Sequence, residues 1–323
     1  LAGEVSGDPH GAALMRELLK DDPSLVLSAT GGPEMVAVPG GGEVDDWLAD
    51  AAVLGLWEVL KKYGYFRQQM TALTARLLAD PPDAIVLIDY PGFNLRLAEA
   101  LRKGNFRGKI LFYISPQVWA WKKGRIPKMA RLLDLIICLF PFEVPLFEDS
   151  GLRAVCSGHP LVDELAAPET ERDPKLVGLL PGSREHEVSK LFPILLGAAG
   201  LLHAEHPELK FVTAAASPER AAQMLEILTE HGLDTGFCEI RRGEGAARKI
   251  MATAQAAAVA SGTATLEAAA HGLPYCLVYR VNWLTYRVGR AVVKLDHIGM
   301  ANILVGREVI RELLQGDCTS RAV

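Results

Sequence analysis

The chain has 323 residues, of which half are hydrophobic and 23% are charged, so it is long enough for two ordinary globular domains. Its formal net charge of −5 disfavours a nucleic-acid partner held by overall charge. The sequence contains no secretory signal and no run of about 18 strongly apolar residues, which predicts a soluble or peripheral protein.

The first residues lead straight from Leu1 into a glycine-bearing turn, GEVSGDPHG. Such a turn normally follows a strand. We therefore expect most of that strand to have been trimmed from the N-terminus.

Short apolar runs alternate with helical stretches along the rest of the chain. Continuous apolar runs, rather than alternating ones, predict strands that are buried on both faces. Strand and helix in alternation predict a parallel α/β sheet. We expect strands at 83–89, 109–115, 133–140, 175–181, 209–216, 254–261 and 274–280, and helices at 11–20, 93–103, 191–207, 218–232 and 263–272.

A polar, proline-bearing break at 164–175 divides the chain into halves that each carry this alternation. The sequence therefore predicts two Rossmann-like domains that face each other across a cleft, residues 1–163 and 164–323. In open α/β sheets ligands bind at the carboxyl ends of the strands, so the residues that follow the strands are the candidates for a site.

Two such positions lie in the first half. In the first turn, Ser6 and Asp8 are polar and suited to contact a sugar, but Asp8 is equally suited to be the N-cap of the next helix. Asp89 ends the strand in LIDYPGFN and is a candidate general base, with a turn-capping role as the alternative.

Two segments of the first half mix aromatic and basic residues. Segment 113–128, YISPQVWAWKKGRIPK, has the composition of a nucleic-acid site, but the negative total charge favours a packed loop at the edge of a cleft. Segment 51–70 has the composition of a membrane interface, although a helix packed on its own domain has it too.

The second half contains LLPGSREHEV, in which Gly182, Ser183 and Arg184 stand between a strand and a helix. Backbone N–H groups at a helix N-terminus favour an anion, and an arginine can bind phosphate through two hydrogen bonds. The alternative is a tight turn with Arg184 paired to Glu185 or Glu187.

A second turn of this kind is ASGTATLE, with Ser261, Gly262 and Thr263 at its mouth. Glu267 follows in the helix, where its carboxylate can accept hydrogen bonds from a ribose diol or interact with the helix dipole. Two such turns in one half favour a nucleotide diphosphate more strongly than either does alone.

Other kinds of site are poorly supported. The chain has no GxGxxG, no HExxH and no DxD, which argues against a dinucleotide site and against a metal-dependent transferase site. The lone His159 is expected to be structural. We expect reduced thiols at Cys138, Cys156, Cys238, Cys276 and Cys318, because no two form a CxxC pair.

Taken in order, the motifs resemble those of the lipid-A-disaccharide synthase family. They cover residues 3–315, nearly the whole chain, and SPQVWAW is rare outside such a context. The motifs are AGEVSGDPHGA, LGLWEVL, IDYPGFN, YISPQVWAWKKGRI, LFPFE, GHPLVD, LLPGSREHEV, ASGTATLEAA and NILVGREVIRELLQ.

The resemblance implies a GT-B fold and an inverting glycosyl transfer without metal or other cofactor. The reaction joins UDP-2,3-diacylglucosamine to 2,3-diacylglucosamine 1-phosphate (lipid X) and releases UDP. It implies a cytoplasmic protein on the inner face of a Gram-negative-type inner membrane, touching it through about residues 53–67. A homodimer is compatible with the resemblance, and no nucleic acid is involved.

The resemblance also assigns roles to individual residues. Asp89 takes the proton of the acceptor 6-hydroxyl, and Ser6 and Asp8 lie on the acceptor side. The UDP donor is held by Gly182, Ser183, Arg184, Ser261, Gly262, Thr263, Glu267 and Asn302, of which the first three hold the diphosphate and Glu267 the ribose.

Two departures from the family pattern stand out. Many members have a second acid where this chain has Gly92, and members continue some tens of residues past Val323 with further helices. Two other functions fit the same turns: a UDP-sugar epimerase or other UDP-GlcNAc transferase, and a nucleotide-sugar-binding module without catalysis.

Overall fold

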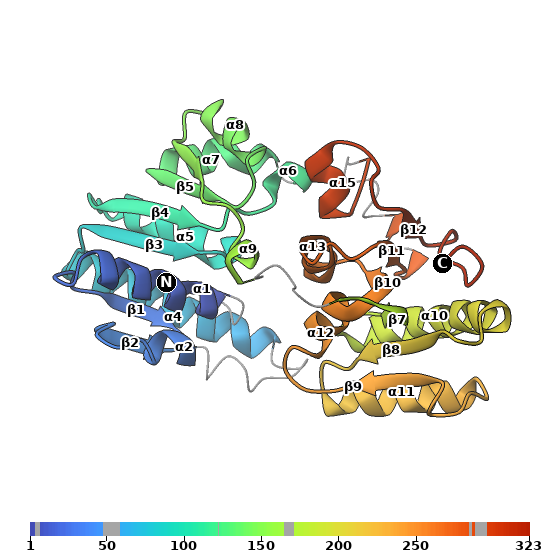
Figure 1. The fold of residues 1–323 in the computed structure, drawn as a ribbon. Coiled ribbons are helices and arrows are strands. Elements are labelled where there is room, and N and C mark those ends of the chain that lie inside the picture. Colours follow the sequence, from blue (N-terminus) through green and yellow to red (C-terminus); the bar gives the residue numbers. More distant parts are fainter. Residues whose placement is uncertain (4–6, 48–58, 122, 165–170, 284–285, 288–295) are drawn as a thin grey trace. The chain divides into compact units, whose positions relative to one another are not determined.

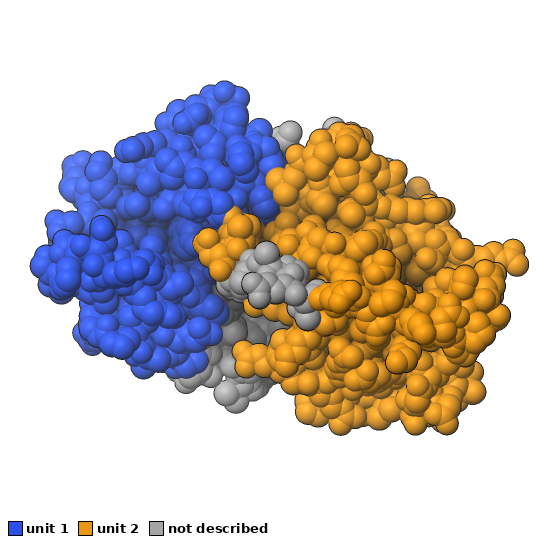
Figure 2. All heavy atoms as spheres, viewed as in Figure 1, with its two compact units in different colours: residues 1–158 blue, residues 159–323 orange. Residues whose placement is uncertain are grey.

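The structure is a computed structural model that describes residues 1–3, 7–47, 59–121, 123–164, 171–283, 286–287 and 296–323. The chain forms two compact units, residues 1–158 and 159–323 (Figure 2). The second unit begins just before the short helix α9 (Leu161–Glu164), whereas the sequence places the division after residue 163.

The second unit contains a six-stranded parallel sheet in the order β12-β11-β10-β7-β8-β9. Its first strand is central, the next two lie to one side and the last three to the other, which is the strand order of a dinucleotide-type Rossmann domain. The strands are β7 (Asp173–Leu180), β8 (Lys210–Ala214), β9 (Cys238–Arg241), β10 (Ala254–Ala260), β11 (Tyr275–Tyr279) and β12 (Glu312–Leu314).

Helices cover this sheet on both faces (Figure 1). Leu179 and Leu180 of β7 point into two different apolar clusters, because successive side chains of a strand point to opposite faces. The helices are α10 (Glu185–Glu205), α11 (Pro218–Glu230), α12 (Ala246–Thr253), α13 (Thr263–Ala270) and α15 (Met300–Val305).

Helix α10 is long and apolar enough to cross a membrane by composition, with a mean hydropathy of 1.2 over its best 18 residues. Its apolar residues, including Phe192, Leu195 and Leu196, are instead buried in the core of the second unit. The helix is therefore a core helix of this unit.

The first unit is also built on parallel strands, and the first residues of the chain lie between two groups of them. A four-stranded parallel sheet runs β3-β4-β5-β6, and β1 pairs with β2 beside it. Residues 1–2 join the two: the Ala2 N–H donates to the Thr30 carbonyl, and the Ile88 N–H donates to the Leu1 carbonyl, at 2.9 and 2.8 Å. Residues 1–2 therefore lie between β1 and β3, where Ala2 forms an isolated bridge with Ile88.

The strands of the first unit are β1 (Ser28–Gly31), β2 (Glu43–Asp46), β3 (Ala84–Ile88), β4 (Lys109–Tyr113), β5 (Leu135–Cys138) and β6 (Ala154–Cys156). Its helices are α1 (Gly7–Asp21), α2 (Pro33–Val36), α4 (Val59–Ala79), α5 (Pro91–Lys103), α6 (Val118–Trp121), α7 (Ile126–Leu132) and α8 (Glu143–Glu148).

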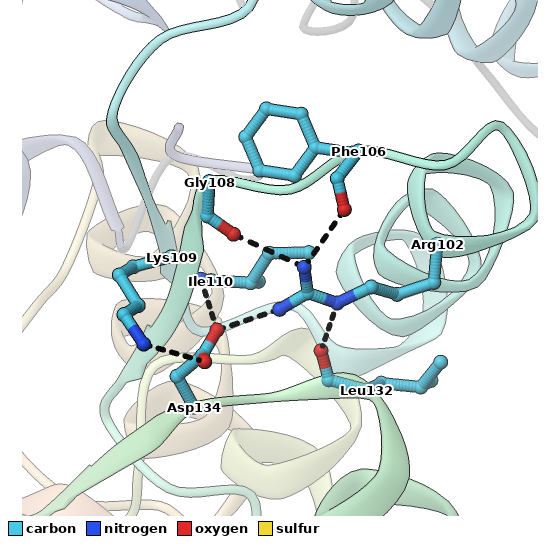
Figure 3. Close-up of polar contacts among 7 residues, drawn as sticks. All are labelled: Arg102, Phe106, Gly108, Lys109, Ile110, Leu132 and Asp134. Carbon is cyan, nitrogen blue, oxygen red and sulfur yellow. Dashed lines mark hydrogen bonds and ion pairs between the residues drawn. The ribbon is translucent and has the colours of Figure 1, made fainter.

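Arg102, at the end of α5, ties the amino-terminal ends of β4 and β5 together (Figure 3). Its guanidinium donates to three backbone carbonyls, those of Phe106, Gly108 and Leu132, and to the Asp134 carboxylate at 2.6 Å. That carboxylate also accepts the Ile110 N–H at 2.8 Å.

The Asp134 carboxyl remains charged in this cluster. Its partial burial alone would raise its pKa, but hydrogen bonds from the Ile110 N–H and Lys109, together with the charge of Arg102, outweigh that effect and hold the pKa below its usual range. The cluster lies at the edge of the sheet away from the strand ends expected to carry the site, so we interpret it as structural.

We expect Arg102→Ala to destabilise the first unit by about 1.5–3 kcal/mol, the usual cost of losing hydrogen bonds to a charged group. Urea unfolding followed by tryptophan fluorescence measures this, because four of the five tryptophans lie in residues 1–158. The exposed Arg107 in the same loop provides the control, and an equal loss in Arg107→Ala would contradict the prediction.

Candidate active site

The two anion-type turns of the second unit lie side by side. β7 pairs directly with β10, with Leu180 opposite Val259, and both strands end at the same edge of the sheet. The turn that contains Gly182, Ser183 and Arg184 follows β7, and the turn that contains Gly262 follows β10. This edge is the switch point of the sheet, where the chain changes direction and where such folds bind ligands.

In the first turn, Glu187 occupies the position expected for an anion. Its Oε2 accepts the backbone N–H groups of Ser183 and Arg184, both at 3.2 Å, and its Oε1 is 3.4 Å from the Arg184 guanidinium. Gly182 has φ +104°, and a Cβ there would clash with the Glu187 side chain. Only glycine fits this position, and the carboxylate closes the turn.

The pairing of Arg184 with Glu187 was one of the two alternatives that the sequence left open. The Arg184 side chain is nevertheless 74% exposed, so most of the guanidinium faces solvent. Tyr279, at the end of β11, adjoins the same turn. Its pKa is raised by burial and by the charge of Glu187, and lowered in part by Arg184.

The second turn has no such internal carboxylate. Helix α13 begins at Thr263 after Gly262, with no side-chain cap and no acid in its first turn. Thr265 is turned inward, because its hydroxyl donates to the Gly262 carbonyl at 2.7 Å. The first N–H groups of this helix therefore lack the side-chain acceptor that Glu187 supplies to α10.

Glu267, expected at the ribose, lies in α13 with its carboxylate 3.6 Å from the Arg248 guanidinium of α12. About a fifth of its side chain is exposed. The acid therefore has a basic neighbour that keeps it oriented at this edge of the sheet.

Asn302 is fully buried, and its side-chain amide is fully used inside the protein. Its Nδ2 donates to the Ile310 carbonyl and to Glu312 Oε1, both at 2.7 Å, and its Oδ1 accepts the N–H groups of Val309 and Ile310. Glu312 in turn accepts the Ile298 and Gly299 N–H groups, each at 3.0 Å. Asn302 and Glu312 together hold α15 against β12. Any effect of Asn302 on the donor therefore acts indirectly, through the position of the segment between α15 and β12.

In the first unit, Asp89 lies at the corresponding switch point, directly after β3 and beside residues 1–3. Asp89 and Tyr90 both have left-handed backbone angles, with φ 47° and 44°. The Asn94 side chain stabilises this turn by donating to the carbonyls of Ile88 and Asp89, at 3.1 and 2.7 Å. Strained backbone at a strand end is typical of functional positions.

Asp8 is buried, with 3% of its surface exposed, and its carboxylate accepts the N–H groups of Gly32, Glu34 and Met35 at 2.9–3.1 Å. It therefore caps the short helix α2 rather than the helix that contains it. Its contact with the acceptor stays a prediction.

The expected acceptor residue Ser6 lies outside the described residues, as do 53–58 of the expected membrane segment 53–67. The remainder of that segment forms the start of α4.

The motif SPQVWAW is packed into its own unit through a buried acid. Trp119 donates through Nε1 to Glu143 Oε1 at 3.0 Å, and the Phe140 N–H donates to Glu143 Oε2 at 3.1 Å. Phe142 stands edge-on to Trp119, with ring centroids 5.1 Å apart. Trp119, in the short helix α6 of segment 113–128, is therefore packed inside its own unit, and the position of this segment at the edge of a cleft stays a prediction.

Burial raises the pKa of Glu143, although hydrogen bonds from the Phe140 N–H and from Trp119 lower it in part. Burial, with the charge of Glu143, also raises the pKa of the Cys138 thiol to about 12. The five cysteines are free thiols, as expected from their spacing.

The structural roles of Glu143 and Glu312 were not deduced from the sequence, and for Glu187 the sequence offered only the pairing with Arg184, not the closure of the turn. Each lies within a motif already singled out, LFPFE, LLPGSREHEV or NILVGREVIRELLQ, so position in a motif was the available signal. Within the described part of the chain, no three His, Cys, Asp or Glu side chains are grouped so as to hold a metal ion.

Comparison with known proteins identifies relatives over the full length of the chain. The family described as lipid-A-disaccharide synthetase matches residues 1–323. Lipid-A-disaccharide synthases of Geobacter metallireducens and Geobacter sulfurreducens are each 39% identical to it, over 100% and 99% of this chain and 84% of their own length.

Solved structures resemble the fold at much lower identity. A UDP complex of Staphylococcus aureus MnaA has a TM-score of 0.59 at 12% identity, over 94% of this chain and 85% of that one. A glycosyltransferase of Rickettsia africae has a TM-score of 0.54 at 10% identity, over 100% and 84%. At these identities the likeness shows a shared GT-B-type fold.

We expect the stability of the first unit to decrease as pH rises above about 4.3, the usual pKa of a glutamate. Because burial raises the pKa of Glu143, the folded chain keeps a proton that the unfolded chain has already lost, and stability falls through that window. Glu143→Gln should flatten this dependence in urea unfolding followed by tryptophan fluorescence. Glu148→Gln, at an exposed position of the same helix, should leave it unchanged, and equal slopes for all three proteins would contradict the assignment.

Proposed function

The chain belongs to the lipid-A-disaccharide synthase family, and on this basis we propose which of its residues perform the reaction. It is a glycosyltransferase with lipid-A-disaccharide synthase activity in lipid A biosynthesis, and its substrates are lipid A precursors. The proposed donor is UDP-2,3-diacylglucosamine and the proposed acceptor is 2,3-diacylglucosamine 1-phosphate. The family does not support UDP-sugar epimerase chemistry.

The adjacency of the two turns at the β7/β10 switch point is the observation that carries the proposed donor site. A diphosphate spans the distance between neighbouring turns and carries negative charge to both helix N-termini, where backbone N–H groups stabilise it. The α13 N-terminus, with Gly262 and Thr263, supplies one group of N–H donors. Arg184, with its exposed guanidinium, supplies the opposing charge as UDP leaves.

The Glu187 carboxylate competes with a bound diphosphate for the same backbone N–H groups. A phosphate oxygen that takes the N–H groups of Ser183 and Arg184 must replace the Glu187 carboxylate, because both are anions and need the same donors. We propose that the diphosphate displaces Glu187, or uses α13 and Arg184 while Glu187 stays in place. The charge of Glu187 opposes binding in either arrangement. Glu267 then accepts the ribose hydroxyls, with Arg248 holding its carboxylate.

In the proposed reaction Asp89 removes the proton of the acceptor 6-hydroxyl as that oxygen attacks the anomeric carbon of the donor. The bond between that carbon and the UDP oxygen breaks, and the electron pair leaves with UDP. Attack opposite to the leaving group inverts the configuration, through a transition state of oxocarbenium character. No metal takes part in this scheme.

Because its proposed substrates are lipids, the enzyme has to contact a membrane surface. We propose that the enzyme works in the cytoplasm on the inner face of the inner membrane, that segment 53–67 contacts acyl chains and headgroups, and that Ser6 and Asp8 lie on the acceptor side.

Arg184→Ala is expected to weaken UDP binding by about 1.5–3 kcal/mol, because a charged hydrogen bond to phosphate is lost. Metal-free calorimetric titration of UDP measures the change. Arg242→Ala removes an exposed arginine at the end of β9 on the same edge and should bind UDP as the unmodified chain does. Glu187→Gln should change affinity in the opposite direction, since it removes the competing charge. Unaltered UDP affinity in Arg184→Ala would place the diphosphate elsewhere.

Asp89→Asn is expected to lower turnover by about 10²–10⁴-fold, the usual contribution of a general base, and to leave UDP affinity near normal. Asparagine tolerates the left-handed backbone angle at this position, so the strained turn is preserved. Initial rates of lipid-dependent UDP release and calorimetric titration measure the two quantities. Loss of UDP binding with loss of turnover would instead make Asp89 a structural acid.

A further inference from the structure

A cavity lies in the second unit at the carboxyl ends of β11 and β12, on the same edge of the sheet as the two turns. It has a volume of about 550 Å³. Six side chains of its wall matter here: Lys190, Arg280, Trp283, Tyr286, Arg287 and Gln315. None of them has a role in the proposed donor site.

The wall of this cavity is strongly cationic. Lys190, Arg280 and Arg287 contribute three positive charges, and among the described residues that line the cavity there is no carboxylate. Within the described part of the chain, none of the three forms an ion pair with an acid. A chain with a net charge of −5 thus leaves three cations together and uncompensated, which favours an anionic ligand at this place.

Gln315 provides a second, independent indication of a ligand with hydrogen-bond acceptors. Its Oε1 accepts the Val281 N–H at 3.3 Å, which fixes the orientation of the amide. Its Nε2 is buried and has no hydrogen-bond partner among the described residues. A buried donor without an acceptor is unfavourable, and a phosphate oxygen in the cavity would satisfy it.

The aromatic residues indicate where such a phosphate comes from. Trp283 is 67% exposed, and the Arg287 guanidinium lies 5.2 Å from the centroid of its ring. An exposed tryptophan beside arginines and a tyrosine is the combination found at membrane interfaces, where the ring sits among headgroups and the cations pair with phosphates. A free phosphate would not need the exposed ring.

We propose that this cavity binds the phosphate of an anionic phospholipid headgroup, with Trp283 inserted in the membrane interface. The site is a membrane contact of the second unit, and it does not depend on the contact proposed for segment 53–67 or on the UDP site. Its chemistry suits an enzyme whose substrates are lipids, because it holds the second unit at the surface where those lipids reside.

Sedimentation with vesicles tests the proposal on the full chain. Vesicles of phosphatidylcholine with 30% phosphatidylglycerol are compared with pure phosphatidylcholine at about 0.1 M salt. Arg280→Gln combined with Arg287→Gln should weaken binding to the anionic vesicles by about 30-fold, given the usual contribution of each cation near such a surface. Trp283→Ala should weaken it further.

A double variant of equal charge provides the control. Lys175→Gln combined with Lys210→Gln removes two exposed cations from β7 and β8, away from the cavity, and should bind anionic vesicles within about twofold of the unmodified chain. Equal losses in both double variants would show a general charge effect and overturn the proposal. So would equal binding of the unmodified chain to both kinds of vesicle.

Two further measurements separate this proposal from the others. The Arg280/Arg287 variant should melt at the same temperature and bind UDP with unchanged affinity, which shows that the fold and the donor site are intact. Should the variant instead raise the KM for lipid X dispersed in detergent while vesicle binding is unchanged, the cavity binds the acceptor phosphate, and the membrane assignment is wrong. Failure of UDP to bind the unmodified chain would count against the donor site alone.

Discussion

The pairing of β7 with β10 is the contact on which the candidate donor site depends. Parallel strands that pair in register end at the same edge, so the ladder that places Leu180 opposite Val259 also brings two glycine turns together that are about 80 residues apart in sequence. In the first unit the backbone of residues 1–2 has the same effect, because it lies between β1 and β3 and thereby places Asp89 beside residues 1–3. Both candidate sites thus follow from strand order.

Carboxylates recur at the helix N-termini of this protein, and their surroundings distinguish structural from binding roles. Asp8 accepts three N–H groups of one turn, Glu187 two, and Glu312 two together with the Asn302 amide. Each satisfies donors that an anion would otherwise take. The start of α13 lacks such a carboxylate, which is why we regard it as the stronger anion site of the two turns.

The strands made of apolar runs were predictable from the sequence, and the short strands with charged residues were not. β3, β7 and β10 consist of apolar runs whose burial on both faces leaves a clear pattern. β2 and β9 have four residues each and include charged side chains, so their sequences do not differ from those of loops. Such edge strands form because a neighbouring strand offers unpaired backbone groups, which is a tertiary effect.

The sequence by itself determined the α/β class, the turns that follow the strands and, through nine ordered motifs, the family. Local composition and spacing suffice for these, because the turn glycines, the buried strands and the motif letters are properties of short segments. Only the tertiary structure decided which acidic side chains already accept hydrogen bonds from backbone N–H groups. Whether Glu187, Glu312 or Asp8 meets a ligand or a backbone N–H depends on where distant segments end, and that is set by strand pairing and side-chain packing across the whole unit.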